Sequence, residues 1–117
     1  MKFLPSILVY FYLISVSFAS TSYYQEALDN FEENKFELSI KYLEKNIVFN
    51  PKSSESYILL GKSYSALDNV DKANKYFKIA YTLIPENVEL NYLLGEVSFN
   101  LGLIEEYAEY LSNLEII

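Results

Sequence analysis

Residues 54–87 read SESYILLGKSYSALDNVDKANKYFKIAYTLIPEN, and this stretch decides the fold. Leu60 and Tyr64 lie one helical turn apart, which places both on one face of an α-helix. Ala73 and Phe77 repeat this spacing further along the chain. The pattern therefore predicts two consecutive helices, each with a single apolar face.

The ends of the two expected helices also carry sequence signals. Asp68-Asn69 is typical of a tight turn between two helices. Pro85 cannot continue a helix and should end the unit, because proline lacks the backbone N–H and clashes with the preceding turn. Ser53 or Ser54 is a suitable N-cap for the first of the two helices. We expect one antiparallel helix pair between these limits.

The same pattern recurs along the chain with a fixed period. The dipeptides Asn50-Pro51 and Ile84-Pro85 place their prolines 34 residues apart. Aligning the chain on this period divides it into three blocks, residues 20–53, 54–87 and 88–117. A sequence that repeats in this way predicts one domain over residues 20–117, built from three similar helix pairs.

The middle block resembles the tetratricopeptide repeat (TPR). It has an accepted residue type at all eight signature positions of that repeat. These are Tyr57, Leu60, Gly61, Tyr64, Ala73, Phe77, Ala80 and Pro85. The resemblance implies an all-α fold, a right-handed α-solenoid of three antiparallel helix pairs, and a protein-binding function.

The third block departs most from this pattern. Tyr107 stands where a small residue is usual, so either the last helix pair has a wider gap or Ala108 takes this role after a one-residue shift. Its second helix should also leave an apolar surface, around the residues Ile104, Leu111, Leu114 and Ile117. Two interpretations remain open: this surface docks a partner or a second copy, or the nearby Tyr and Glu residues make it tolerable in water.

The N-terminal segment differs from the rest of the chain. Lys2 is followed by an apolar run at residues 3–18 and by the small residues Ser17 and Ala19, the pattern of a secretory signal. We expect residues 1–19 to be a signal peptide, and the protein to be exported to the periplasm or secreted. Two alternatives are a retained membrane anchor, with residues 3–18 as the tether, and a buried first helix. The run falls short of the roughly 20 apolar residues of a spanning helix.

Composition excludes several functions. The sequence has no His, Cys or Arg, so a zinc finger, a thiol nucleophile and a Ser-His dyad are absent. We expect no enzyme activity, no catalytic residue, no metal and no cofactor. The formal net charge is −7, and no lysine follows Lys78. The acidic C-terminal third would repel nucleic acid and attract a basic partner, or simply maintain solubility.

The resemblance also implies where a ligand would bind. In TPR proteins the first helix of each pair lines a concave groove. The positions that match this surface are Tyr24, Leu28, Phe31, Ile58, Leu59, Lys62, Tyr92, Leu93, Glu96 and Phe99. Family members that clamp a peptide carboxylate use Lys and Asn in the groove, and the matching positions here hold Tyr24, Leu28, Leu59, Glu89 and Leu93. Such a clamp is therefore not expected.

These features lead to one functional prediction with one alternative. We predict an exported adaptor or scaffold, which binds a protein or peptide through an apolar and aromatic groove with an acidic rim. A basic, amphipathic segment would suit that groove. The alternative is a structural module that self-associates into a homo-oligomer through its last helix pair.

Overall fold

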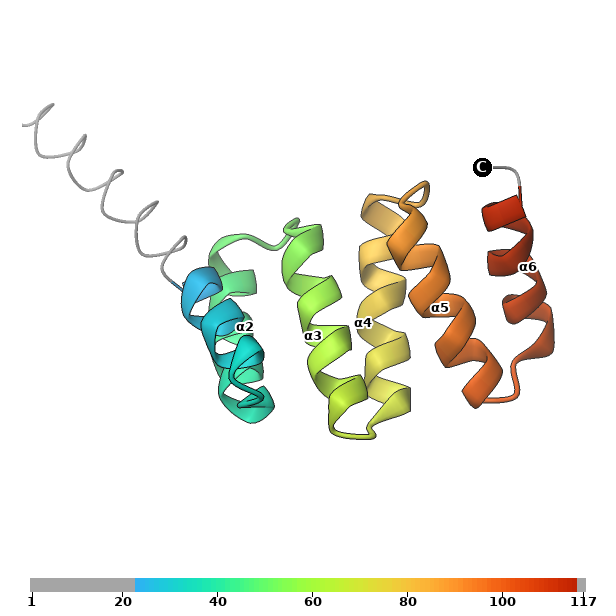
Figure 1. Ribbon diagram of the computed structural model, residues 1–117. Helices are drawn as coiled ribbons and strands as arrows, with labels where there is room; N and C mark the ends of the chain where they lie inside the picture. The colour runs from blue at the N-terminus through green and yellow to red at the C-terminus, as the bar shows by residue number, and fades with distance from the viewer. Residues whose placement is uncertain (1–22, 116–117) are drawn as a thin grey trace, which may run out of the picture.

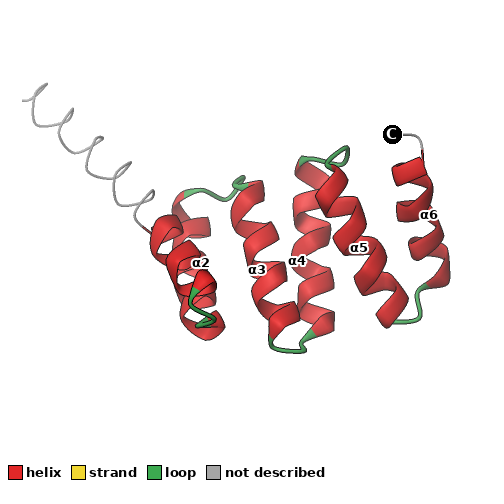
Figure 2. Cartoon of the chain, viewed as in Figure 1, coloured by secondary structure: helices red, strands yellow, loops and turns green. Residues whose placement is uncertain are grey.

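The computed structural model describes residues 23–115 of the chain (Figure 1). The predicted signal peptide at residues 1–19, the membrane tether at residues 3–18 and Ile117 lie outside the described residues. Within the described part, every regular element is an α-helix, and consecutive helices run in opposite directions between short loops (Figure 2). The all-α prediction is confirmed.

The helices follow one another in a row, and each packs against its neighbours in the chain (Figure 1). We call the helical residues 23–32 the first helix. The helices after it are α2 (Phe36–Phe49), α3 (Ser54–Ala66), α4 (Val70–Leu83), α5 (Val88–Asn100) and α6 (Ile104–Glu115). The first helix with α2, α3 with α4, and α5 with α6 form the three expected pairs.

The backbone repeats with the period of the sequence. The turn inside each pair contains one residue with a left-handed backbone: Asn34 (φ 61°), Asp68 (φ 59°) and Gly102 (φ 73°). These residues are spaced by 34, and Asn, Asp and Gly are the types that tolerate this conformation best. The turn that the sequence predicts at Asp68-Asn69 is confirmed.

The loops between pairs are also held in an equivalent way. The hydroxyl of Tyr57 donates to the carbonyl of Pro51 at 2.7 Å, and the amide of Asn91 donates to the carbonyl of Pro85 at 2.9 Å. Each proline thus ends one pair while its carbonyl anchors the first helix of the next. Ser53, as predicted, caps α3 by accepting from the backbone N–H of Ser56.

Packing inside the pairs differs between the middle and the last. In the middle pair, the ring of Phe77 lies directly on the backbone of Gly61, which has no side chain to block it. In the last pair, a Cβ atom on Gly95 would be 3.8 Å from the Cβ of Tyr110, an ordinary contact distance. Ala108 is exposed, so it does not take the small-residue role. The last pair therefore follows the first alternative and is more open at its glycine.

A tyrosine recurs in the second helix of every pair, and sequence analysis missed it. Tyr42, Tyr76 and Tyr110 are spaced by 34 residues. Each ring contacts a tyrosine of a preceding helix: Tyr23 at a centroid distance of 6.5 Å, Tyr64 at 5.5 Å and Tyr81 at 5.5 Å, respectively. Because the interval equals the repeat length, the sequence alone could have revealed this series.

Candidate functional site

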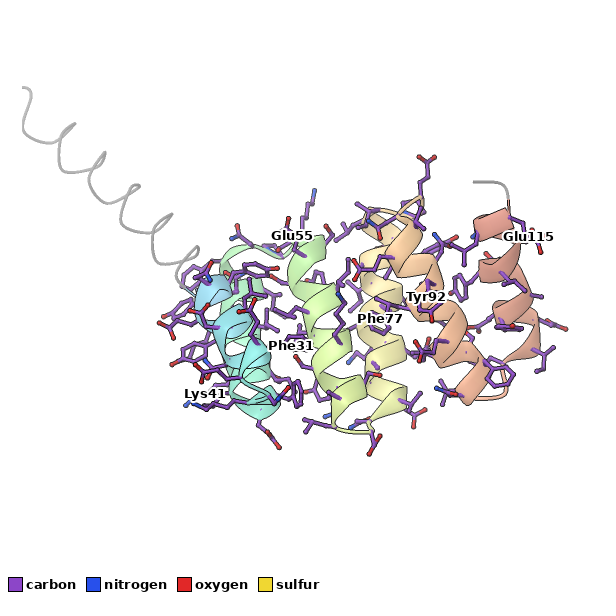
Figure 3. All side chains as sticks on the ribbon, in the orientation of Figure 1. Phe31, Lys41, Glu55, Phe77, Tyr92 and Glu115 are labelled. Atoms are coloured by element: carbon purple, nitrogen blue, oxygen red, sulfur yellow. The ribbon has the colours of Figure 1, made fainter. Side chains whose placement is uncertain are left out.

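Two of the open pockets on the described surface are lined by residues of neighbouring helices. The first, which we call the groove, lies between the first helix and α3 and reaches the start of α5. Its volume is about 290 Å³. Its lining residues are Tyr24, Leu28, Phe31, Glu32, Glu55, Ile58, Leu59, Lys62 and Glu89. Figure 3 shows Phe31 on the side of the first helix pair that faces α3.

The groove combines apolar walls with acidic groups. Tyr24, Leu28, Phe31 and Ile58 are partly buried against the core, so each keeps some apolar surface open to solvent. Leu59 is only 5% exposed and belongs mainly to the core. A short stretch of apolar surface between partly open walls suits the side chains of a peptide or a partner helix.

Charge in the groove is unbalanced. Glu32, Glu55 and Glu89 contribute three carboxylates, and Lys62 is the only base among the lining residues. Lys62 forms an ion pair with Glu89, so the charge of this lysine is already matched. The pKa of Tyr24 is raised above its usual value, first by burial and then by the nearby Glu55 carboxylate. The groove therefore has a net negative charge, which favours a basic ligand.

The second pocket lies at the other end of the row, between α5 and α6. We call it the terminal pocket, and its volume is about 280 Å³. It is lined by Tyr92, Gly95, Glu96, Phe99, Tyr107, Leu111 and Leu114. Tyr92 and Phe99 are about three-fifths exposed, at 61% and 62%, and Tyr92 lies on the side of α5 that faces α6 (Figure 3). Aromatic side chains this open form an unusually apolar surface.

The structure divides the ten predicted groove residues between these places. Six line the groove: Tyr24, Leu28, Phe31, Ile58, Leu59 and Lys62. Three line the terminal pocket instead, namely Tyr92, Glu96 and Phe99, while Leu93 is partly buried against the core. Nine of the ten predicted residues thus line one of two pockets, and α5 contributes residues to both pockets.

The repeat itself explains this division. Tyr92 and Phe99 hold the positions of Tyr24 and Phe31, two repeats later. In the first repeat these positions face α3, whereas no described helix follows α6 to cover their equivalents. Glu32 and Glu55 were not among the predicted site residues. Glu55 could have been found, because it is the repeat equivalent of Glu89.

Over residues 23–115, no group of three or more Asp or Glu side chains is placed to hold a metal ion. Within the same range, no helix is both long and apolar enough to cross a bilayer. The chemistry that the two pockets support is the binding of side chains by apolar contact and charge.

Comparison with known proteins supports the fold. No family model matches the sequence. The second TPR domain of Spaghetti (RPAP3), bound to the HSP90 peptide SRMEEVD, is similar with a TM-score of 0.77 and 16% identity, over 83% of this chain and 90% of that one. MamA from Desulfovibrio magneticus is similar with a TM-score of 0.76 and 20% identity, over 81% of this chain and 54% of that one.

The secretion chaperone SycD and the BBSome member BBS4 are also similar to this chain. SycD of Yersinia enterocolitica, in complex with a peptide of the translocator YopD, gives a TM-score of 0.76 and 17% identity, over 81% of this chain and 72% of that one. The BBSome complex member BBS4 of Bos taurus is 38% identical over 58 residues, which are 50% of this chain and 11% of BBS4. The chain therefore spans about a tenth of that relative and about half of MamA. These similarities establish that the fold is a right-handed TPR-type α-solenoid.

Proposed function

We propose that this protein is an adaptor that binds a protein or peptide partner in the groove. The observation that carries the proposal is the set of half-open apolar side chains, Tyr24, Leu28, Phe31 and Ile58, gathered from two neighbouring helices. Two structural neighbours, the RPAP3 domain and SycD, were solved with peptides bound. Their shared fold supports a binding role for this chain.

The partner is a basic, amphipathic segment, because the groove is apolar inside and acidic in charge. The peptide bound by the RPAP3 domain, SRMEEVD, has three acidic residues and one basic residue. Such a peptide would be repelled by Glu32 and Glu55, and the Tyr24 and Leu28 positions offer it no positive charge. We therefore propose that this groove selects ligands of the opposite charge.

We also propose that the protein acts outside the cytoplasm and has no catalytic role. Export rests on the signal-like pattern of residues 1–19, and the alternative is that residues 3–18 stay as a membrane tether. Mass spectrometry of exported material separates the two, since an intact Met1 would contradict cleavage after Ala19. The non-catalytic role rests on a sequence without His or Cys, and the acidic surface argues against nucleic acid as a partner.

Selection from a random peptide library on the immobilised protein tests the groove. We expect the enriched peptides to share apolar anchors spaced for one helical face and to carry lysine or arginine. Ile58→Asp should weaken their binding by about tenfold or more, because it places a charge in the apolar wall. Val48→Asp is the matched control, since Val48 is an exposed apolar residue on α2 outside the groove lining.

A second variant separates charge from packing. Glu55 is exposed at the start of α3, so Glu55→Lys should weaken the basic peptides without changing the helical circular dichroism spectrum. Enrichment of acidic peptides, or equal binding by the Ile58→Asp and Val48→Asp variants, would reject the proposed groove function.

A further inference from the structure

We propose that the terminal pocket is the seat of an amphipathic helix from a different protein, and that this helix carries a basic residue in its first turn. This site is separate from the groove, because no residue lines both pockets. The inference rests on how the repeats inside this chain pack against one another, and it does not depend on a ligand in the groove.

The terminal pocket repeats a surface that is filled elsewhere in the molecule. Its α6 residues Tyr107, Leu111 and Leu114 lie 34 residues after Ala73, Phe77 and Ala80 of α4. These three α4 residues are at most 1% exposed, and α4 packs against the following helix α5. In contrast, Leu111 is 42% exposed. Inside the chain this surface is therefore buried between α4 and its two neighbours α3 and α5, whereas the equivalent surface in the terminal pocket stays open.

The first helix pair meets the second where α2 packs against α3, and we call this contact the first junction. Its contacts show which residues of a helix bound at the terminal pocket would meet the pocket. Asn46 of α2 donates to the Ser56 hydroxyl of α3 at 2.8 Å, and Ser39 lies 3.5 Å from the hydroxyl of Ser63. Two repeats later, Asn46 and Ser39 correspond to Leu114 and Tyr107.

The incoming helix therefore presents two residues, seven apart, to Leu114 and Tyr107. These must be apolar, because the surface no longer offers the polar partners found at the first junction. In α5 the residues at these two positions are the apolar Leu90 and Val97.

The second junction, where the second helix pair meets the third, indicates the charge that the partner should carry. Lys62 of α3 forms an ion pair with Glu89 of α5, at the start of the incoming helix. One repeat later, the position of Lys62 is held by Glu96, which lines the terminal pocket. The sign of the charge on the receiving side is therefore reversed. A helix bound in the terminal pocket, in the register that α5 has at the second junction, would place its first turn beside Glu96. A lysine or arginine in that turn would be attracted by Glu96, and a glutamate would be repelled.

The same charge disfavours a second copy of this chain as the occupant. The first helix, which would stack head to tail, carries Glu26, Asp29 and Glu32 and no base. Two terminal pockets facing each other would bring together surfaces that contain glutamate and no lysine, since Lys78 is the last basic residue of the sequence. The proposal therefore commits to a heterologous basic helix.

The chain itself supplies the probe for a test. A labelled peptide of residues 86–101 contains the whole of α5, whose Leu90, Leu94 and Val97 fill the equivalent surface in the fold. The peptide with Glu89→Lys is the probe and the unchanged peptide is its matched control. In fluorescence anisotropy with the full chain, we expect the probe to bind about tenfold more tightly at low salt, with the difference reduced at 1 M salt.

Three variants of the full chain give the decisive readings. Glu96→Lys should reverse the preference, so that the unchanged peptide binds more tightly than the probe. Leu111→Asp, at a partly exposed position, should weaken both peptides by about tenfold or more, while Val48→Asp, outside both pockets, should leave both unchanged.

Several outcomes would overturn the proposal. The first is that the probe shows no saturable binding. The second is that the probe and the control peptide bind equally to the parent chain and equally to Glu96→Lys. The third is that Ile58→Asp abolishes binding while Leu111→Asp does not. A dimer in light scattering that Leu111→Asp dissociates would instead assign the pocket to a second copy. If the groove variants do not change peptide binding in the library experiment, the results at the terminal pocket are unaffected. The two proposals are therefore tested separately.

Discussion

The ring of Phe77 occupies the space that a Cβ atom on Gly61 would need. Phe77 is 1% exposed and protein interiors are close-packed, so a shift of the ring would disturb its buried neighbours. The closest approach within the middle pair therefore depends on the absence of a side chain at Gly61.

Replacing this glycine should destabilise the protein. Gly61→Ala adds one methyl group against a buried ring, and we expect a loss of about 1–3 kcal/mol in the free energy of unfolding. Urea denaturation followed by circular dichroism measures this loss.

Gly95→Ala is the matched control, because its new Cβ would lie 3.8 Å from Tyr110. Alanine favours a helix over glycine, so this control should gain about 0.5–1 kcal/mol. Equal effects of the two changes would contradict the packing of Phe77 on Gly61.

The left-handed turns lead to a second prediction. Gly102 has φ 73° with open space around its Cα, so only the backbone opposes a side chain there. Gly102→Ala should lower the free energy of unfolding by about 1–2 kcal/mol. Gly102→Asn should lower it less, because asparagine tolerates this conformation and already occupies the equivalent position at Asn34. Thermal unfolding of the two variants compares them, and a greater loss for asparagine would contradict the argument.

These turns show what the sequence could predict. The period of 34 predicted the helix pairs. The turn at Asp68 and a cap at Ser53 or Ser54 were also predictable, because each depends on the local preference of one or two residues. The tyrosine series at Tyr42, Tyr76 and Tyr110 was equally visible but was overlooked, because it is not part of the repeat signature.

The candidate site was less accessible to sequence reasoning. Tyr24 and Tyr92 hold equivalent positions, yet they line different pockets. Their surroundings depend on which helix packs beside them, and this is a property of the whole row of helices. Likewise, Leu59 follows Ile58 in the sequence, but only the structure shows that Leu59 is nearly buried while Ile58 opens into the groove.

Tyr110 makes stability depend on pH in the alkaline range. Burial first, and then the nearby charges of Glu106 and Glu109, raise the pKa of Tyr110 from 10.0 to about 12. The folded state therefore holds this proton more tightly than the unfolded state. The resulting stability is fully present below about pH 10 and is lost as the pH rises to about 12.

Urea midpoints measured from neutral pH to pH 11.5 test this effect. Tyr110→Phe keeps the ring that contacts Tyr81 and removes the ionisable group, so its stability should fall less steeply above pH 10. Some decline should remain, because the pKa values of Tyr64 and Tyr76 are also raised, chiefly by burial. Parallel curves for the variant and the parent chain would show that Tyr110 does not contribute.

A buried polar contact joins the first two repeats. The side-chain amide of Asn46, a residue 2% exposed, donates to the hydroxyl of Ser56 at 2.8 Å, and the side-chain oxygen Oδ1 of Asn46 has no hydrogen-bond partner. Ser56→Ala leaves this buried side chain without the Ser56 bond, and we expect a loss of about 1–3 kcal/mol in unfolding free energy.

Asn46→Ala should be less damaging, because it removes the unpaired oxygen together with the donor, and Ser56 keeps its 2.8 Å bond to Ser53. Urea denaturation of both single variants and the double variant forms a double-mutant cycle. We expect a coupling free energy of about 1 kcal/mol between the two substitutions. The double variant removes both partners of the bond, so neither group is left buried without its partner. A coupling near zero would mean that the bond between Asn46 and Ser56 does not contribute to the packing of α2 on α3.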